Sequence, residues 1–363
     1  MKHISFFITS LSSGGAERQL VQLAEYLSER GYMVDVVTFA DMSDHYKTSE
    51  SIKRVRIAEN KNRIIKLLSI FWFFLRIKTD VIISFGQRVS LFCLVPLFLR
   101  GRINVICGER NLTIGDPSKT ERFLWGYLYK RADWIVPNSY SQGKYLVSRY
   151  KELEPKIKTI INYTDLNKYQ FANYSGNSPF NVSLFCRYNK QKNYENFAKA
   201  VKDFCVKHGA VMHFNWYGDK YIKDKTINPD YLKFVELLKQ YDIEGVVTLN
   251  GKTDQVARIM AESDAICLPS IFEGFSNTLS EAICCGKIVL ASDVSDNSVM
   301  VHDGENGFLF NPYDIEDMVN AFEKLIYTSI DDKIKMQRKS RDIAQKLFNK
   351  DSFVQSYVKL IES

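Results

Sequence analysis

The stretch Glu273-Gly274-Phe275-Ser276-Asn277-Thr278-Leu279-Ser280-Glu281 decides the fold, and it continues to Gly286. An apolar run at residues 265–268 precedes it, and a second run at 288–291 follows it. Ser276 suits the N-cap of the intervening helix, and Gly286 suits its C-terminal end. Strand, turn, helix and strand in this order predict a parallel sheet, whose strands carry ligand sites at their carboxyl ends.

The start of this predicted helix is the first candidate binding site. The first backbone amides of a helix lack partners within it, and the helix dipole places partial positive charge there. We therefore expect the amides of Asn277, Thr278 and Leu279 to attract a phosphate group. Two carboxylates, Glu273 and Glu281, lie on either side of these amides.

The same alternation of strands and helices extends over the whole chain. In the first half, strands are predicted at residues 4–8, 34–39, 81–84, 104–107, 134–136 and 157–161, with helices between them. In the second half, strands are predicted at residues 182–185, 213–217, 246–249, 265–268, 288–291 and 308–310, and the last fifty residues are predicted to be helical. Each half is thus predicted to be a doubly wound α/β domain.

The domain boundary is expected near a polar, turn-rich stretch at residues 173–179. We predict an N-terminal Rossmann-like domain at residues 1–170 and a C-terminal one at 171–345. A final helix at 346–363 is expected to pack back toward the first domain. The chain has 363 residues, too many for one ordinary core, and its 45% apolar content is enough for two.

Composition also limits the location of the protein. No apolar run reaches transmembrane length, and the N-terminus lacks the pattern of a signal peptide. The seven cysteines have no paired metal-ligand spacing, which indicates reduced thiols, and the five histidines have no spacing that suggests a metal site. We therefore expect a cytoplasmic protein without a bound metal.

The net charge of +7 is unevenly distributed along the chain. Residues 1–173 contain 26 Lys and Arg against 16 Asp and Glu, whereas the rest of the chain contains 23 against 26. A basic first half suits nucleic acid or the anionic leaflet of a membrane, although charges scattered over a solvated surface explain the same count. Because no nucleic-acid-binding module is recognisable, we expect no nucleic acid partner.

Residues 61–78 combine large apolar side chains with five basic residues. This composition is typical of a helix that lies in a membrane interface. It fits equally a crossover helix that is buried against the sheet and whose basic ends reach solvent. The residues alone leave both interpretations open.

Two further loops carry candidate phosphate ligands. Gly14 and Gly15 follow the first predicted strand, where a pair of glycines can adopt positive φ and lets a ligand approach the backbone. They lack the Gly-x-Gly-x-x-Gly spacing of a dinucleotide site. Arg187 and Lys192 follow the first strand of the second half, and two cations at such a position can clamp a diphosphate.

Together these motifs resemble those of glycosyltransferase family 4, and of bacterial surface-polysaccharide glycosyltransferases in particular. The resemblance is carried by Ser13-Gly-Gly-Ala-Glu-Arg18, Arg187 with Lys192-Asn193, Pro269-Ser270, Glu273 to Glu281, and His302-Asp-Gly-Glu-Asn-Gly307. It implies the GT-B architecture, in which two Rossmann-like domains face each other across a cleft. Members transfer a sugar from a nucleotide-sugar donor with retention of configuration, generally without a catalytic metal.

The resemblance also implies roles for individual residues. Arg187 and Lys192 would bind the donor diphosphate and stabilise the leaving nucleotide. Glu273 would act at the donor sugar, and Glu281 would hold the ribose. The donor site would be completed by Gly14, Gly15, Gly251, Thr253, Gly274, Phe275, Ser276, Asn277, Thr278 and Leu279, with the two domains closing around the donor.

The acceptor side departs from the family pattern. Many members carry a histidine where this chain has Gly108-Glu109-Arg110-Asn111. Glu109 is therefore expected to share in catalysis, with Arg110 and Asn111 on the acceptor side. Retention could arise from double displacement or from front-face attack; the residues favour neither, and the family favours the second.

The expected activity is transfer of a hexose or N-acetylhexosamine from a UDP-sugar, with a GDP-sugar as second choice. The expected acceptor is a glycan such as a lipid-linked oligosaccharide or a lipopolysaccharide or capsule precursor. Apart from the nucleotide-sugar, no cofactor is expected, and the basic first half would allow peripheral attachment to the inner face of the cytoplasmic membrane. Two alternatives remain: a nucleotide-sugar 2-epimerase of the same architecture and a non-catalytic nucleotide-sugar-binding protein.

Overall fold

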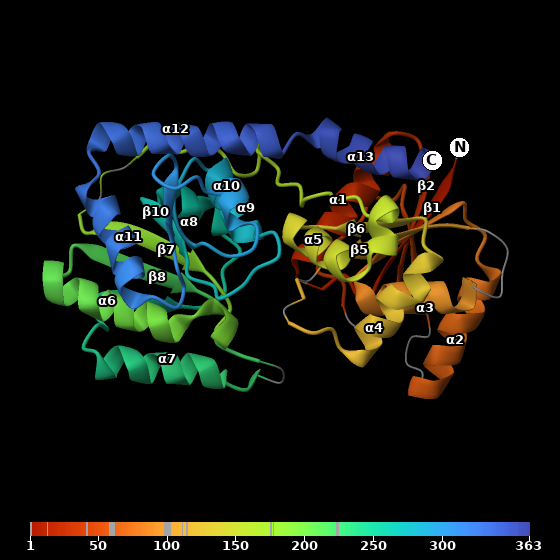
Figure 1. Cartoon of the computed structure of the whole chain (residues 1–363), viewed down its shortest axis with the longest axis horizontal. Coiled ribbons are helices and arrows are strands. Elements are labelled where there is room, and N and C mark those ends of the chain that lie inside the picture. Colours follow the sequence, from red (N-terminus) through yellow and green to blue (C-terminus); the bar gives the residue numbers. More distant parts are fainter. Residues whose placement is uncertain are drawn as a thin grey trace. The chain divides into compact units, whose positions relative to one another are not determined.

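The structure, a computed structural model, describes residues 2–12, 14–40, 43–57, 62–97, 103–110, 112–113, 115–174, 176, 178–222 and 225–363. The chain forms two compact units, one made of Met1–Tyr163 with Lys350–Ser363 and the other of Thr164–Asn349. Each unit is a parallel sheet with helices on both faces (Figure 1). The predicted α/β class with two Rossmann-like domains is confirmed.

The first sheet has six parallel strands in the order β3-β2-β1-β4-β5-β6. The strands are β1 (His3–Ile8), β2 (Met33–Thr38), β3 (Lys53–Arg56), β4 (Val81–Phe85), β5 (Asn104–Glu109) and β6 (Trp134–Pro137). Ile4 of β1 is in register with Val34 of β2 on one side and Val81 of β4 on the other. Because helices cover both faces, the central strands are nearly continuous runs of buried residues.

The helices of the first unit form two layers. They are α1 (Gly15–Glu29), α2 (Arg63–Arg76), α3 (Gln87–Leu97), α4 (Lys119–Gly126), α5 (Tyr140–Arg149) and α13 (Lys350–Glu362), with short 3-10 turns η1 (Leu128–Lys130) and η2 (Lys151–Lys156). Leu20 of α1 and Tyr357 of α13 share a core on one face of the sheet. Phe74, Leu94 and Trp125, from α2, α3 and α4, share the core on the other face (Figure 1).

The second sheet repeats this topology, with strand order β12-β11-β10-β7-β8-β9. Its parallel strands are β7 (Phe180–Phe185), β8 (Met212–Tyr217), β9 (Val247–Asn250), β10 (Ala265–Leu268), β11 (Ile288–Ser292) and β12 (Gly307–Phe310). The chain runs outward from β7 to β9 and then returns to β10, on the other side of β7. Neighbouring strands β7 and β10 therefore form a topological switch point, where the carboxyl ends of a doubly wound sheet leave a crevice.

The helices of the second unit cover both faces of its sheet. They are η3 (Lys190–Lys192), α6 (Tyr194–His208), α7 (Pro229–Gln240), α8 (Val256–Glu262), α9 (Asn277–Cys284), α10 (Asn297–Met300), α11 (Ile315–Tyr327) and α12 (Ile330–Leu347). On one face, α6, α7 and α11 enclose an aromatic cluster in which Phe197 contacts Trp216, Phe234 and Phe322. On the other face, α9 and α10 lie beneath α12 (Figure 1).

Three details differ from the sequence predictions. β3 was not predicted, because its residues Lys-Arg-Val-Arg carry charge at three of four positions. Residues 157–161 do not form a strand, since only Ile157 bridges to Ile135. The units also divide before the turn-rich stretch at 173–179, because Arg341 of α12 donates to the carbonyl oxygens of Leu166 and Tyr169 and ties these residues to the second unit.

Within the described ranges, no helix combines the length and the apolar character that a bilayer-spanning helix requires.

Candidate active site

The loop after β7 presents the first charged residues of the switch point. Asn189 caps the 3-10 turn η3, and its side chain accepts a hydrogen bond from the backbone amide of Lys192 at 3.2 Å. The next residue, Asn193, adopts the left-handed conformation with φ 58° and donates from its side chain to the carbonyl oxygen of Pro312 at 2.8 Å. These contacts fix the direction of Lys192, whereas Arg187 at the start of the loop is exposed.

The loop after β10 is bound directly to the loop after β7. Gln191 makes two hydrogen bonds to it: its carbonyl oxygen accepts from the amide of Ile271 at 2.8 Å, and its side-chain amide donates to the carbonyl oxygen of Phe272 at 2.9 Å. The backbone amide of Glu273 donates to the hydroxyl of Ser295 at 3.2 Å. Gln191 and Ser295 therefore hold Glu273 from both sides.

As a result, Lys192 and Glu273 meet at the switch point. The Nζ atom of Lys192 donates to Oε1 of Glu273, and the two side chains are only 14% and 11% exposed. An ion pair shielded from water to this extent interacts more strongly than one at the surface. The pair places a cation and a carboxylate side by side in the crevice where doubly wound sheets bind ligands.

Helix α9 starts beside this pair, as predicted. The hydroxyl of Ser276 accepts from the amide of Leu279 at 3.3 Å, so one of the three amides expected to attract phosphate already has a partner in the cap. Thr278 donates through its hydroxyl to the carbonyl oxygen of Phe185 at 3.2 Å, which ties the helix start to the end of β7. Gly286, with φ 69°, follows the end of the helix. Glu281 lies on this helix and is buried.

The other donor-site residues of the second unit have different environments. Phe275 is buried, and its ring contacts that of Phe348 at a centroid distance of 6.3 Å, so it acts as a packing residue in this structure. Gly274 precedes it in the same loop. Gly251 is exposed after β9, and the hydroxyl of Thr253 accepts from the amide of Gln255 at 3.0 Å, which shapes the turn into α8.

Gly14 and Gly15 lie at the start of α1, next to the switch point between β1 and β4 of the first sheet. Positive φ is not the reason for these glycines, because Gly14 has φ −159° and Gly15 is helical. A Cβ atom on Gly14 would meet only the flexible carboxylate of Glu17. The carboxylate of Glu17 occupies the space that this Cβ atom would take.

Glu109, at the end of β5, has an environment unlike that of Glu273. Its side chain is fully buried and accepts hydrogen bonds from Gln87 at 3.0 Å, from the indole of Trp125 at 3.2 Å and from the hydroxyl of Tyr129. Burial raises the pKa of Glu109, and the three hydrogen bonds offset part of this effect. Because its oxygens are occupied inside the unit, direct contact with an acceptor is not favoured.

Of the two residues predicted on the acceptor side, Arg110 and Asn111, the structure describes Arg110. Arg110 stacks over the ring of Phe85 at 3.8 Å and donates to the hydroxyl of Tyr357 at 2.8 Å. Arg110 is thus bound to the last helix of the chain. Asn111 lies outside the described residues, so its predicted role stays a prediction.

Sequence reasoning missed the residues that position the site. Gln191 and Ser295 were not predicted as site residues, and Ser295 adopts φ 55°, which is unusual for a residue other than glycine. Gly86, with φ 104°, follows β4 at the other switch point and also escaped notice. No charge or spacing marks these positions, because their function is to orient neighbouring residues.

Two family models match the chain: Glycosyltransferase Family 4 over residues 13–168 and Glycosyl transferases group 1 over residues 176–346. The Campylobacter jejuni enzyme N-acetylgalactosamine-N,N'-diacetylbacillosaminyl-diphospho-undecaprenol 4-alpha-N-acetylgalactosaminyltransferase is 24% identical, with 94% of each chain covered. Sucrose-phosphate synthase from Thermosynechococcus elongatus matches with TM-score 0.83 at 17% identity, covering 100% of this chain and 98% of that one. Anabaena HepE in complex with UDP matches with TM-score 0.80 at 18% identity, covering 100% of both.

Two doubly wound units with this strand order define the GT-B class of enzymes. The two family models together cover most of the chain, and the chain belongs to the glycosyltransferases that they describe. The predicted family and the predicted enzyme class, a glycosyltransferase, are both confirmed.

Proposed function

We propose that this glycosyltransferase moves a hexose or N-acetylhexosamine from a UDP-sugar to a lipid-linked glycan precursor, with retention of configuration. The observation that carries the proposal is the Lys192–Glu273 pair at the switch point between β7 and β10. A GDP-sugar is the second candidate donor. UDP is favoured because a structure with the same fold, Anabaena HepE, is a complex with UDP.

In this proposal the ion pair changes partners when the donor binds. Without a donor, Lys192 neutralises the buried carboxylate of Glu273. A diphosphate offers Lys192 an anion of higher charge, and Arg187 can add a forked contact to the same group. Glu273 is then free to accept hydrogen bonds from sugar hydroxyls, while Glu281 binds the ribose. The amides at the start of α9 contribute further donors to the phosphates.

The reaction that fits these residues is a front-face displacement. The bond between the anomeric carbon and the β-phosphate oxygen breaks as the acceptor oxygen bonds to that carbon on the same face. The proton of the acceptor hydroxyl passes to the departing phosphate oxygen. Arg187 and Lys192 stabilise the charge that builds on the nucleoside diphosphate, so the proposal needs no metal ion.

The acceptor proposal rests on a relative of similar length. The name of the Campylobacter jejuni enzyme specifies an acceptor attached to diphospho-undecaprenol. By analogy, we propose that the acceptor of this protein is a lipid-linked oligosaccharide, or a lipopolysaccharide or capsule precursor, at the inner face of the cytoplasmic membrane. Its basic first half suits such a surface.

The test incubates the purified chain with UDP-, GDP- and TDP-sugars, with and without a polyprenyl-diphosphate-linked saccharide. We expect UDP release that depends on the acceptor, an elongated product with the anomeric configuration of the donor, and an unchanged rate in EDTA. An altered donor sugar without an elongated acceptor would indicate an epimerase instead. Donor binding without any turnover would indicate a non-catalytic protein.

A further inference from the structure

Helix α2 (Arg63–Arg76) is anchored to the first unit by one face only. Phe74 is fully buried, and its ring contacts that of Phe7 in β1 at a centroid distance of 4.6 Å. Ile70 is buried in the same core. The side chain of Asn62 caps the helix by accepting from the amide of Ile65 at 2.9 Å. These contacts explain why the helix forms and leave its other side uncovered.

The uncovered side of α2 is also apolar. It exposes five large side chains: Ile64, Ile65, Leu67, Leu68 and Trp72. Ile64 is 72% exposed and Trp72 is 53% exposed, and the spacing of four between Ile64, Leu68 and Trp72 aligns them along the helix. A contiguous apolar stripe on a soluble unit marks an interaction surface.

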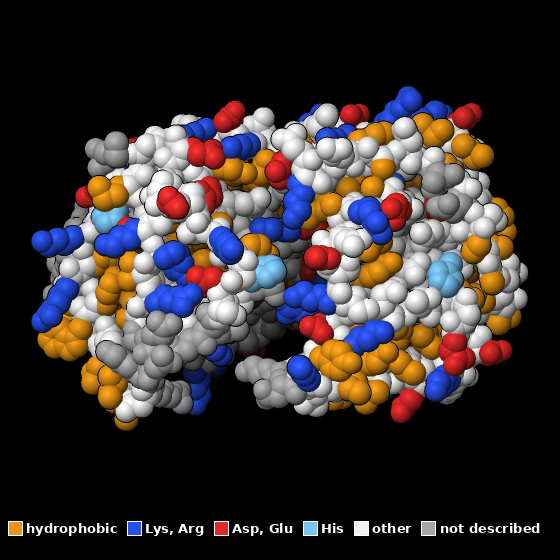
Figure 2. All heavy atoms as spheres, turned by 180° about the vertical axis from the view of Figure 1, so that it is seen from behind, with side chains coloured by type: hydrophobic (Ala, Val, Ile, Leu, Met, Phe, Trp, Pro, Cys, Tyr) orange, Lys and Arg blue, Asp and Glu red, His pale blue; other side chains and the backbone are white. Residues whose placement is uncertain are grey.

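Basic side chains accompany this stripe. Residues 61–78 contain five Lys and Arg and no Asp or Glu. The guanidinium of Arg76 lies over the ring of Trp72 at 5.3 Å, and Arg76 and Lys78 are exposed at the C-terminal end of α2. The space-filling view shows one face of the molecule, on which hydrophobic side chains lie near Lys and Arg at the lower left (Figure 2).

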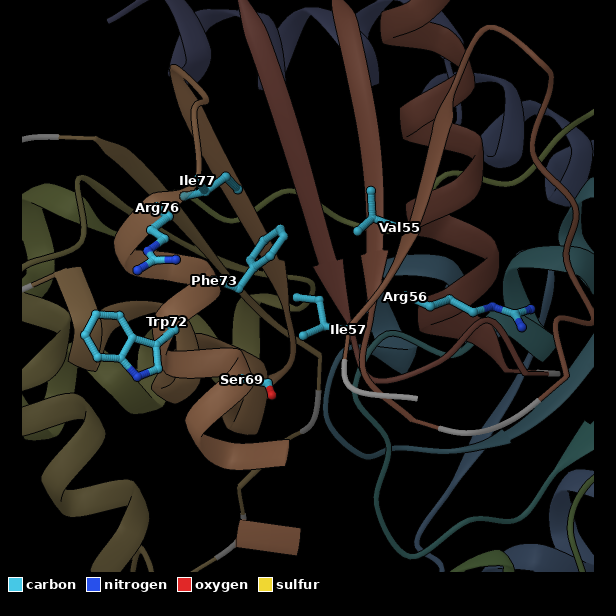
Figure 3. Close-up of a pocket in the computed structure, with 8 residues that line it drawn as sticks. All are labelled: Val55, Arg56, Ile57, Ser69, Trp72, Phe73, Arg76 and Ile77. Atoms are coloured by element: carbon cyan, nitrogen blue, oxygen red, sulfur yellow. The ribbon is translucent and has the colours of Figure 1, made fainter. Parts of the chain in front are cut away.

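A groove of about 550 Å³ runs between α2 and the end of β3. Its lining includes Val55, Ile57, Ser69, Trp72, Phe73 and Arg76. In Figure 3, Trp72 and Arg76 extend from α2 on the same side, whereas Phe73 points from α2 toward Ile57, the residue that follows β3. An apolar groove with a guanidinium at its edge suits a chain that is apolar at one end and anionic at the other.

We propose that α2 lies in the plane of an anionic membrane, with the five exposed apolar side chains below the phospholipid headgroups. Arg76 and Lys78 would contact headgroup phosphates, and the groove would accept part of one acyl chain. With 14 residues, α2 is about 21 Å long, shorter than the ~30 Å core of a bilayer, so it lies on the membrane and does not cross it. Trp72 suits the interface, where aromatic residues of this kind concentrate.

Charge favours an anionic membrane over a second copy of the chain as the partner of α2. A symmetric dimer through α2 would bring the exposed cations Arg76 and Lys78 of both copies into one interface, and residues 61–78 contribute no acidic residue to it. Anionic headgroups neutralise this charge. The proposal deepens the proposed function, because a lipid-linked acceptor would be presented at that surface. Membrane binding can nevertheless be measured without donor or acceptor, so failure of one proposal does not decide the other.

Vesicle binding by the full chain tests the proposal. Binding to phosphatidylcholine vesicles that contain about 30% phosphatidylglycerol, an anionic lipid, is compared with binding to vesicles of pure phosphatidylcholine. Trp72 is the exposed one of the four tryptophans, so its insertion should shift the intrinsic fluorescence to shorter wavelength. We expect binding to the anionic vesicles that is at least ten-fold tighter, together with this shift.

Variants locate the surface and keep the test independent of folding. Ile64→Glu with Leu68→Glu should reduce anionic-vesicle binding at least ten-fold, whereas the control Val206→Glu, at an exposed position of α6, should bind as the wild type does. UDP binding by all of them should be unchanged, which shows that they are folded. Equal vesicle binding by the double variant and the wild type would overturn the proposal. A dimer in solution that the double variant converts to a monomer would overturn it as well, in favour of a second copy.

Discussion

Glu273 and Glu109 each follow a strand of a parallel sheet, yet the two units use these carboxylates differently. Glu273 lies at a switch point, pairs with the cation of Lys192 and is fixed through its backbone by Ser295. Glu109 lies inside the first unit, where neutral donors from Gln87, Trp125 and Tyr129 occupy its oxygens. A carboxylate paired with a lysine cation can exchange that partner for substrate, whereas one enclosed by neutral donors supports the fold.

Glu273→Gln should have the largest effect on the transfer rate. The amide keeps the size of the side chain but removes the charge beside Lys192 and the sugar. We expect the transfer rate to fall by about 10²–10³-fold, the typical effect of removing one preorganised electrostatic contact. UDP binding should persist. Glu262→Gln, an exposed carboxylate on α8, is the control and should leave the rate unchanged; a Glu273 variant with the wild-type rate would remove this residue from the site.

Substitution of Gln191 should have the next largest effect on the transfer rate, because this residue joins the loop after β7 to the loop after β10. Gln191→Ala loses the side-chain hydrogen bond to Phe272, a contact of about 1 kcal/mol, and we expect transfer to slow by about five-fold. Combined with Lys192→Ala, it should cause little additional loss, since both changes act on the same pair. Fully additive effects in this double-mutant cycle would show that Gln191 does not act through Lys192. Gln240→Ala, at the exposed end of α7, is the control.

Glu109→Gln should alter the pH dependence of stability more than it alters transfer. Burial raises the folded-state pKa of Glu109 above its ordinary value of 4.5. The stability that this shift contributes is therefore complete below pH 4.5 and is lost as pH rises through the folded-state pKa. Compared with the wild type, the variant should gain in melting temperature between pH 5 and pH 8, by about a few degrees. A constant difference at both pH values would contradict a raised pKa of Glu109, and Glu152→Gln on the surface should show no such trend.

The smallest expected effect is on the reactivity of the cysteine thiols, including Cys186 in the loop after β7. Burial raises the pKa of Cys186, next to Arg187, to about 12, so this cysteine should stay protonated and unreactive at pH 8. Six of the seven cysteines are buried, and Cys205 is partly accessible. Mass spectrometry after brief iodoacetamide treatment of the folded protein should find label on Cys205 alone. Rapid labelling of Cys186 would show that the loop after β7 opens.

Much of the fold could be predicted because buried parallel strands leave apolar runs in the sequence, as β7 and β10 do. The charged edge strand β3 leaves no such run, and its pairing with β2 depends on the tertiary structure. Within the site, Ser276 and Gly286 were recognisable from helix-end preferences alone. The pairing of Lys192 with Glu273 was not, because it depends on two loops 81 residues apart that Gln191 joins.

We propose that Lys192 is the cation that receives the donor diphosphate. Titration of UDP into wild type, Lys192→Ala and Lys190→Ala tests it most directly, since Lys190 lies in the same 3-10 turn and is exposed. We expect wild type and Lys190→Ala to bind UDP equally. Lys192→Ala should bind UDP at least ten-fold more weakly, a difference in binding free energy of about 1.4 kcal/mol or more. Equal binding by Lys192→Ala and the wild type would contradict it.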